Sequence, residues 1–382
     1  MSRFYLFRHI VRDGRLRWSR RSLPPPVSGP EVKERQHAAF DWILRSIDAV
    51  HGQGSSKGYS YVRGWLPAYP ETSGYIISSL LRYGETFAAP QAMEKAKGIA
   101  RWLGGVINAD GGISAIGATA SPSLAFDTGM VLQGLTDLAQ TTGEPCWAGL
   151  AHRCADFLVA RQQDDGSWSQ DYSSIPHAYH ARIAWPLLRY GIVFDRPRAR
   201  SAAEASLSWV LKQQRENGTF AQAFFSPRLP YVNTHSLGYI VEGLLESYLL
   251  TRTEEWRAAA ERTADRLAGI LFRNRGFLPG FFREDWQEKR LFPVSFACLT
   301  GMAQLSRCWF LLYRMTGDAR HLEAGNLSLS HVVRYQDIET GQPAVRGALP
   351  GSGPFFGRYL PLQFPNWAAK FLLDALMEKS RA

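Results

Sequence analysis

Side chains capable of acid–base chemistry recur along this sequence, each at the start of a mostly apolar run. Glu71 and Asp127 begin two of these runs, and His235 begins another. Carboxyl and imidazole groups are the commonest general acids and bases in proteins. If the runs are parallel helices around one axis, their first residues meet at one end of the fold. The pattern therefore predicts a single polar cavity assembled from distant parts of the chain.

The remaining runs open on side chains of similar character. They are His177, Tyr179 and His180 with Arg182 behind them, then Cys298, and then Asn366 with Trp367. We predict five catalytic residues, namely Glu71, Asp127, Tyr179, His180 and His235. We predict that the substrate is bound by Trp65, Tyr69, Tyr75, His177, Arg182, Asn366 and Trp367. The positive ends of six helix dipoles at this place would favour an anionic ligand.

Each residue also has an ordinary structural explanation. Glu71, Asp127 and Asn366 are types found at helix N-termini, where capping or the helix dipole alone accounts for them. His180 and His235 suit hydrogen-bonded core positions, and Cys298 suits a small buried hydrophobe. Capping, however, predicts Ser and Thr as readily as His, Tyr and Glu. The recurrence of the polar set in all six runs favours a functional cavity.

The elements that must position these residues are two interleaved sets of predicted helices. Amphipathic runs rich in Arg, Glu and Ala cover 31–50, 90–106, 145–162, 197–214, 253–272 and 319–336. More apolar runs cover 71–84, 122–140, 176–190, 233–250, 294–316 and 364–379. The first set predicts outer helices with one solvated face, and the second predicts buried inner helices. Glycines in "LLRYGE", "LLRYGI", "RMTGD" and "TTGE" are predicted C-caps of inner helices.

A turn motif repeats between the two sets. "QQDDGSW" (162–168) is echoed by "NADGGI" (108–113) and "QQRENGTF" (213–220), and more weakly elsewhere. One glycine from each unit, Gly64, Gly112, Gly166, Gly218, Gly276 and Gly347, gives spacings of 48, 54, 52, 58 and 71 residues. Such spacings accommodate two helices and two connections. We expect the tryptophan of the motif to dock on the next hairpin.

Six hairpins of this kind predict an all-α (α/α)6 toroid. An open solenoid would need polar capping repeats at both ends. The last run, "NWAAKFLLDALM" (366–377), is as apolar as the others and needs a neighbour, which favours a closed ring. We predict a basic leader over residues 1–30 and a single toroid domain over residues 31–382.

The chain resembles known toroid families. "QQDDGSW" is similar to the Gln–Gly–Trp turn of the squalene-cyclase and protein-prenyltransferase toroids, which are related to the six-hairpin glycosidases. The rest resembles the VpsJ-type polysaccharide biosynthesis proteins in "GWLPAYPETSGYII" (64–77), "FDTGMVLQGL" (126–135), "YHARIAWPLL" (179–188), "THSLGYIVEGLLE" (234–246), "CLTGMAQ" (298–304) and "FPNWAAKFLLDAL" (364–376). This resemblance implies an exopolysaccharide context and no particular reaction.

Two routes of carbohydrate chemistry fit the predicted cavity. Glu71 and Asp127 could flank a glycosidic bond as acid and base, which for inversion requires carboxyl groups ~6.5–9.5 Å apart. Alternatively, Tyr179 or His180 could abstract a proton from a uronic acid in β-elimination or epimerisation, with Asn366, Arg182 or His235 neutralising its carboxylate. We expect cleavage of a glycosidic bond in an acidic or lipid-linked exopolysaccharide intermediate, with lyase or epimerase chemistry second.

Other classes of function remain open. Terpene cyclisation needs a DxDD or diphosphate-binding motif, and neither is present. A zinc toroid would need Cys298 with His180, His235 or Asp127 as ligands, and no local spacing supports one. We expect no cofactor and no metal. A non-catalytic glycan-binding component of a polysaccharide synthesis complex is the main alternative to an enzyme.

The bulk composition suits a globular protein of this size. Of 382 residues, 45% are hydrophobic and 13% are aromatic. Four scattered cysteines predict reduced thiols and a cytoplasmic location. Residues 1–23 contain seven arginines and one acidic residue. This segment therefore carries most of the net charge of +10. This segment could contact an anionic membrane at the inner face. We expect an oligo- or polysaccharide substrate and no nucleic-acid partner.

Overall fold

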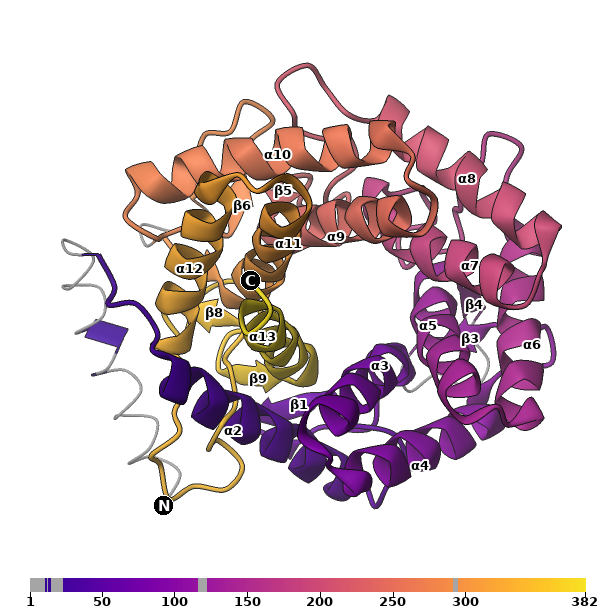
Figure 1. Cartoon of the computed structure of the whole chain (residues 1–382), viewed down its shortest axis with the longest axis horizontal. Coiled ribbons are helices and arrows are strands. Elements are labelled where there is room, and N and C mark those ends of the chain that lie inside the picture. Colours follow the sequence, from indigo (N-terminus) through magenta and orange to yellow (C-terminus); the bar gives the residue numbers. More distant parts are fainter. Residues whose placement is uncertain (1–10, 12, 15–22, 116–121, 291–294) are drawn as a thin grey trace.

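Twelve α-helices in the described part of the chain form two concentric rings around one axis (Figure 1). The computed structural model describes residues 11, 13–14, 23–115, 122–290 and 295–382. The outer ring contains α2 (Gly29–Asp48), α4 (Pro90–Val106), α6 (Pro145–Arg161), α8 (Pro197–Lys212), α10 (Glu254–Arg273) and α12 (Ala319–Val333). The inner ring contains α3 (Pro70–Phe87), α5 (Ala125–Thr142), α7 (Ala181–Val193), α9 (Thr234–Thr251), α11 (Leu299–Thr316) and α13 (Asn366–Lys379). The predicted (α/α)6 toroid is confirmed.

The first and last helices close the ring. α13 packs against α2 and α3, so each inner helix has an inner neighbour on both sides. In addition, β1 (Gly58–Ser60) pairs antiparallel with β9 (Gln363–Pro365), which joins segments from opposite ends of the chain. Closure buries the apolar surface of α13, as its sequence requires. The division into a leader and one domain stays a prediction, although α2 begins at Gly29, inside the expected leader.

Short antiparallel strands hold the loops at the N-terminal ends of the inner helices. β2 (Gly64–Trp65) extends the β1–β9 pair. The other pairs are β3 (Ile113–Ser114) with β4 (Ser123–Leu124), β5 (Val232–Asn233) with β6 (Phe281–Phe282), and β7 (Ala297–Cys298) with β8 (Ser352–Gly353). Four of these strands, β4, β5, β7 and β9, lead directly into an inner helix. The strands therefore fix the backbone where the predicted site lies.

Local sequence explains where the helices begin and how closely they pack. Four outer helices, α2, α4, α6 and α8, carry proline in the first turn, where its missing N–H has no helical partner to lose. Inner helices α3 and α5 approach closely because Gly74 faces the backbone of Met130 and Val131, and Gly134 faces that of Gly74. A Cβ added to Gly134 would lie 2.0 Å from the carbonyl oxygen of Gly74. Small residues thus set the radius of the inner ring.

The repeated turn has a defined structure at Gly166. Its φ of +90° is in the left-handed region, and an added Cβ would lie 2.5 Å from the carbonyl oxygen of Ala205 on the next outer helix. Gln162 donates to the carbonyl oxygens of Gly166 and Ala202, which ties the turn to α8. The prediction that Trp168 docks on the next hairpin is partly right. Its ring centroid lies 6.5 Å from that of His180 before α7, but its indole N–H donates to the carbonyl oxygen of Leu158 in the preceding α6.

The predicted turn glycine was wrong in two of the six repeats, and the predicted C-cap was wrong in two inner helices. The glycines that turn back against the next outer helix with positive φ are Gly54, Gly111, Gly166, Gly218, Gly276 and Gly347, so Gly54 and Gly111 replace Gly64 and Gly112. Gly143 and Gly317 are left-handed C-caps as expected. Gly84 and Gly191 instead lie inside α3 and α7. A Cβ added to Gly84 would contact Ala92 of α4, and one added to Gly191 would clash with Arg200 of α8.

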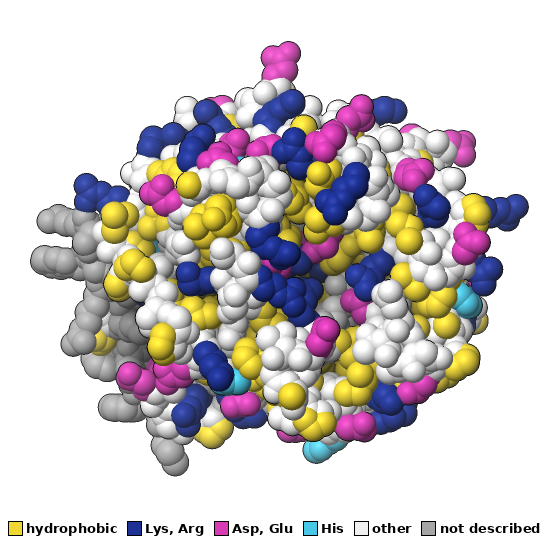
Figure 2. All heavy atoms as spheres, viewed as in Figure 1, with side chains coloured by type: hydrophobic (Ala, Val, Ile, Leu, Met, Phe, Trp, Pro, Cys, Tyr) yellow, Lys and Arg dark blue, Asp and Glu magenta, His cyan; other side chains and the backbone are white. Residues whose placement is uncertain are grey.

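The arginines of residues 1–23 lie outside the described residues; within that segment, Asp13 is buried and accepts a hydrogen bond from the Phe355 N–H. No described helix has the length and apolar character needed to cross a membrane. Figure 2 shows Lys and Arg side chains gathered around the central hollow. Arg82, late in α3, forms an ion pair with Asp374, and Arg189, late in α7, forms one with Asp137.

Candidate functional site

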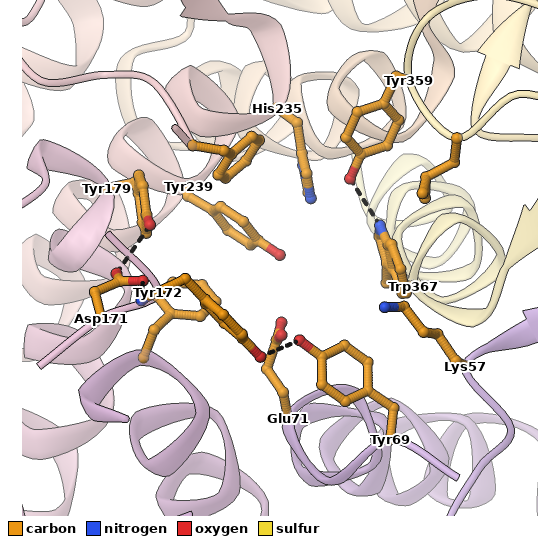
Figure 3. A pocket seen from close by; sticks show the side chains of 13 residues that line it. Lys57, Tyr69, Glu71, Asp171, Tyr172, Tyr179, His235, Tyr239, Tyr359 and Trp367 are labelled. Carbon is orange, nitrogen blue, oxygen red and sulfur yellow. Dashed lines mark hydrogen bonds between the residues drawn. The ribbon is translucent and has the colours of Figure 1, made fainter. Parts of the chain in front are cut away.

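A cavity of about 310 Å³ lies among the residues that precede or begin the inner helices (Figure 3). Its walls are largely aromatic, with a few polar groups. The lining residues are Lys57, Tyr69, Glu71, Phe126, Asp171, Tyr172, Tyr179, Phe225, His235, Tyr239, Tyr359, Leu360 and Trp367. A cavity of about 480 Å³ between α6 and α8 is larger, but the acid–base cluster does not line it. The smaller cavity is therefore the candidate site.

Glu71, the second residue of α3, carries a perturbed carboxyl group. Its side chain lines the cavity and is only 8% exposed. Burial raises its pKa to about 7, against the lowering effects of a Tyr69 hydrogen bond and the charge of Lys57. Near neutral pH this group is present in both protonated and ionised forms, which suits a general acid.

Asp127, near the start of α5, lies behind the cavity wall rather than in it. It is fully buried, and its Oδ2 accepts a hydrogen bond of 3.1 Å from the Tyr172 hydroxyl. Its Oδ1 has no hydrogen-bond partner among the described residues. Burial, with repulsion from Glu71 and Asp171, raises the pKa of Asp127 well above its usual value. Asp127 and Glu71 therefore titrate as a coupled pair.

Asp171 is the ionised carboxylate of the cavity. Its Oδ2 accepts hydrogen bonds from the Tyr179 hydroxyl at 2.9 Å and from His180 Nε2 at 2.8 Å. Burial would raise its pKa, but His180, His177 and Tyr179 outweigh that effect and lower it. Sequence reasoning missed Asp171, which lies in the loop before α7. It did identify Tyr179 and His180, the residues that hold Asp171 in place.

His235, the second residue of α9, also faces the cavity (Figure 3). Its Nδ1 lies 3.0 Å from Oε1 of Gln304 on α11. Burial lowers the pKa of His235 to about 3, so the imidazole is neutral at neutral pH. A neutral ring with so low a pKa is a weak base, but its free nitrogen remains a good hydrogen-bond acceptor.

The aromatic walls present both ring faces and hydroxyl groups. Trp367 Nε1 donates to the Tyr359 hydroxyl at 2.9 Å, and Tyr69 packs edge-on against Trp367. The Tyr69 and Tyr172 hydroxyls are 3.1 Å apart, as the dashed line in Figure 3 shows. Lys57 Nζ lies 4.9 Å from the centroid of the Tyr69 ring. Flat rings beside polar groups are suited to a sugar, which has apolar faces and hydroxyl edges.

Two predicted binding residues lie in the core instead. Tyr75 is fully buried between two cations, with Arg182 5.9 Å and Lys370 5.0 Å from its ring centroid. Arg182 is also fully buried, and its Nε lies 3.3 Å from Oε2 of Glu242. Neither residue is among those that line the cavity. Both belong to the charged interior of the inner ring.

Three further predicted residues support the surrounding loops. Trp65 packs against Trp42 and Tyr59, and His177 Nε2 lies 2.7 Å from the Ser173 hydroxyl. Asn366 donates from Nδ2 to the hydroxyls of Ser55 and Thr72. None of the three lines the cavity. Tyr69 and Trp367, by contrast, contribute directly to its walls.

The residues that sequence reasoning missed come mostly from loops. Lys57, Asp171, Tyr172, Phe225, Tyr359 and Leu360 all lie between an outer helix and the next inner helix. The residues predicted from the sequence lie mainly in the first turns of the inner helices. The signal that would have found these residues is their position between a turn glycine and the following apolar run.

The cysteines and possible metal ligands give no second centre. All four cysteines are unpaired, as predicted, and Cys298 is buried before α11. Within the ranges that the structure describes, no three His, Cys, Asp or Glu side chains are grouped so that they could hold a metal ion. The zinc site considered from the sequence is therefore not formed there.

Comparisons with known proteins show similarity in fold. No family model and no curated protein matches the sequence. Among solved structures, the chain is similar to an unsaturated glucuronyl hydrolase specific for heparin (TM-score 0.72, 13% identity, covering 92% of this chain and 97% of the other). It is also similar to the unsaturated glucuronyl hydrolase from Bacillus sp. GL1 (TM-score 0.71, 15% identity, covering 92% of this chain and 97% of the other). Cellobiose 2-epimerase from Spirochaeta thermophila is a third such structure (0.69, 14%, 94% and 99%).

The protein has the six-hairpin toroid fold. Nearly the whole of each compared chain takes part in the superposition, so the similarity extends to all six hairpins. At these identities the comparison establishes the fold alone. The toroid's reaction must be argued from the groups that line its cavity.

Proposed function

We propose that this toroid hydrolyses a glycosidic bond in a short acidic saccharide. The observation that carries the proposal is one aromatic-lined cavity that holds Glu71, with a pKa raised to about 7, and Asp171, with a lowered pKa. Glycosidases need one protonated and one ionised carboxyl group. In this assignment Glu71 protonates the leaving oxygen, and Asp171 accepts a proton from the attacking water.

Asp127 assists Glu71 without contacting the substrate in this scheme. Repulsion between two close carboxylates favours retention of a proton by the pair. Asp127 also holds Tyr172 at the cavity through the hydrogen bond to its hydroxyl. We therefore propose that Asp127 positions Tyr172 and favours retention of a proton by the coupled pair that it forms with Glu71. The prediction that Asp127 itself acts as acid or base is not part of this scheme.

Elimination has less support from the side-chain geometry. Tyr179 and His180 both donate to Asp171, and burial raises the pKa of Tyr179 well above its usual value. The Tyr179 hydroxyl is therefore a poor base at neutral pH, and His180 is not among the residues that line the cavity. Of the three expected neutralising groups, Arg182 pairs with Glu242 in the core, Asn366 does not line the cavity, and His235 is neutral.

Epimerisation is the second candidate reaction. It is favoured by the position of His235, whose ring faces the cavity, and by the similarity in fold to cellobiose 2-epimerase. A histidine with a pKa of about 3 is, however, a weak proton acceptor. Hydrolysis through Glu71 requires no such base.

An acidic substrate is supported by charge. Lys57 is the cationic side chain among the residues that line the cavity, and Glu71 is partly protonated near neutral pH. A substrate carboxylate can pair with Lys57. The names of the glucuronyl hydrolases of similar fold agree with such a substrate.

The biological setting stays a proposal resting on the sequence. On the strength of the VpsJ-type resemblance, we propose a role in exopolysaccharide biosynthesis, with a nascent or lipid-linked oligosaccharide as substrate in the cytoplasm or at the inner membrane face. A non-catalytic glycan-binding role is the alternative if the cavity binds saccharides but converts none. The terpene-cyclase reading has no further support from the cavity.

The experiment is an assay against a panel of saturated and unsaturated uronic acid oligosaccharides, followed by mass spectrometry and ultraviolet absorbance. Hydrolysis adds the mass of one water per cleavage, whereas elimination creates an absorbing conjugated double bond. We expect Glu71→Gln and Asp171→Asn to lose at least about 100-fold in kcat. Glu85→Gln, an exposed change on the same helix α3, should retain full activity. New absorbance without water addition would reject the proposed reaction.

A further inference from the structure

A chain of buried polar side chains runs from the cavity into the core. His235 Nδ1 lies 3.0 Å from Gln304 Oε1, and Gln304 Nε2 donates to Glu242 Oε2 at 2.7 Å. Glu242 Oε1 in turn accepts from Arg307 Nη1 at 2.8 Å. Each of these four residues is at most 4% exposed. The chain connects α9 and α11, two neighbouring inner helices.

The direction of every hydrogen bond in this chain follows from Glu242. Burial would raise its pKa, but Arg182, Lys370 and Arg307 lower it to about 2, so Glu242 is an ionised acceptor. Gln304 must then point its NH2 group at Glu242 and its oxygen at His235. An amide oxygen only accepts, so His235 must carry its proton on Nδ1.

The local sequence leaves room for this arrangement. Gly238 lies one turn after His235 on α9, and a Cβ there would stand 2.4 Å from Gln304 Oε1. Gly301 lies one turn before Gln304 on α11, and a Cβ there would lie 2.7 Å from the backbone nitrogen of His235. The two glycines let the helices approach closely enough for the bond between the side chains.

We propose that His235 is a fixed hydrogen-bond acceptor, with its proton on Nδ1 and its Nε2 lone pair directed into the cavity, and that it selects a hydroxyl group of the ligand. Figure 3 shows the imidazole pointing into the space between Tyr359 and Tyr239. The ligand class is a polyol or saccharide with a donor hydroxyl at this place. The saccharide identity rests on the proposed function, whereas the tautomer does not.

An acceptor of fixed direction discriminates among ligands. A ligand that lacks the hydroxyl would leave Nε2 desolvated and unpaired, and one with a methyl ether there could not donate. The loss of a hydrogen bond to a buried group corresponds to about 10- to 100-fold in affinity. Gln304 acts through His235, so it is a positioning residue rather than a catalytic one.

The tautomer can be measured without any ligand. Long-range proton–nitrogen NMR correlations on protein labelled with ¹⁵N-histidine distinguish a protonated Nδ1 from a protonated Nε2, and the His235→Phe variant identifies the His235 signals. We expect the Nδ1–H form in the wild type and a mixture or the other tautomer in Gln304→Leu. Gln133→Leu is the matched control, because Gln133 is also a buried inner-helix glutamine but bonds to Ser78. An Nε2–H or imidazolium signal in the wild type at neutral pH would overturn the proposal.

Selection of a hydroxyl is measured by calorimetric titration with methyl β-glucuronide and its singly deoxygenated forms. One deoxy form should bind about 10- to 100-fold more weakly to the wild type, and that difference should vanish in His235→Phe. Equal affinities for all forms would overturn the hydroxyl contact. Failure of the parent glucuronide to bind would overturn the proposed function and this contact, while the NMR signals alone would decide the tautomer.

Discussion

The Tyr172 hydroxyl donates a 3.1 Å hydrogen bond to Asp127 Oδ2, although Tyr172 is 56% exposed and Asp127 is fully buried. The same hydroxyl lies 3.1 Å from that of Tyr69, whose hydrogen bond to Glu71 lowers the pKa of that carboxyl. A surface loop thus reaches the coupled carboxyl pair. Tyr172 closes one wall of the cavity and links the two acids through hydroxyl groups.

Replacement of Tyr172 by Phe should impair catalysis with little effect on folding. The variant loses a hydrogen bond that lowers the pKa of Asp127, so that pKa should rise further. We expect kcat to fall about 3- to 10-fold, as for one hydrogen bond, with an unfolding midpoint near that of the wild type. The measurement is kcat against pH beside a thermal melt. Tyr231→Phe, in the loop before α9, is the control; equal activity of both variants would remove Tyr172 from the site.

Replacement of Glu71 by Gln should change how stability depends on pH. The folded-state pKa of Glu71 is raised from 4.5 to about 7. Between these values the unfolded chain has lost the proton and the folded chain keeps it, so the wild type loses stability as pH rises through this window, by up to about 3 kcal/mol. Glu71→Gln should flatten that decline in denaturant titrations from pH 4 to 8. Parallel curves for the two proteins would contradict the raised pKa.

Lys57 should matter for acidic substrates only. If its ammonium group pairs with a substrate carboxylate, Lys57→Met should raise KM for a uronic acid oligosaccharide about 10-fold or more, as expected for a lost charged hydrogen bond. KM for the neutral counterpart should not change. Lys212→Met, an exposed change at the end of α8, serves as the control. An equal rise in KM for both substrates would place the carboxylate elsewhere.

The repeated turns should tolerate no side chain at their glycines. Gly111 has φ +87°, and an added Cβ would lie 2.2 Å from the carbonyl oxygen of Arg153. Gly111→Ala should therefore lower the free energy of unfolding by about 1–3 kcal/mol or more. Gly149→Ala, in α6 with open space around it, should raise that energy by up to about 1 kcal/mol. Urea unfolding measures both, and equal effects would contradict the turn geometry.

The helices could be predicted because local patterns encode them. The amphipathic run at 90–106 is the same range as α4, and the apolar run at 233–250 differs from α9 by one residue. The predicted left-handed C-cap was right at Gly143 and wrong at Gly84. Glu follows both Gly143 and Gly84, but α3 continues past Gly84 to a left-handed cap at Ala88, and a Cβ on Gly84 would lie 3.1 Å from the Cβ of Ala92. That contact depends on how two helices pack, which no local pattern records.

The candidate site could be predicted only in part. Glu71 and His235 were found because the start of an inner helix always faces the same end of the ring. Arg182 lies one residue into α7 yet points at Glu242, and Asp171 lies in a loop yet lines the cavity. Side-chain direction and loop path depend on hydrogen bonds between distant segments, such as that from Tyr172 to Asp127.

By itself, the sequence determined the periodicity of twelve helices, their order as outer and inner elements, and the closure of the ring. The spacing of apolar residues shows which face of each helix must be buried. Only the tertiary structure decided which carboxyl groups keep their protons, which cations pair in the core, and which nitrogen of His235 is free. Those properties come from burial and from charges on other helices, and neither acts until the chain has folded.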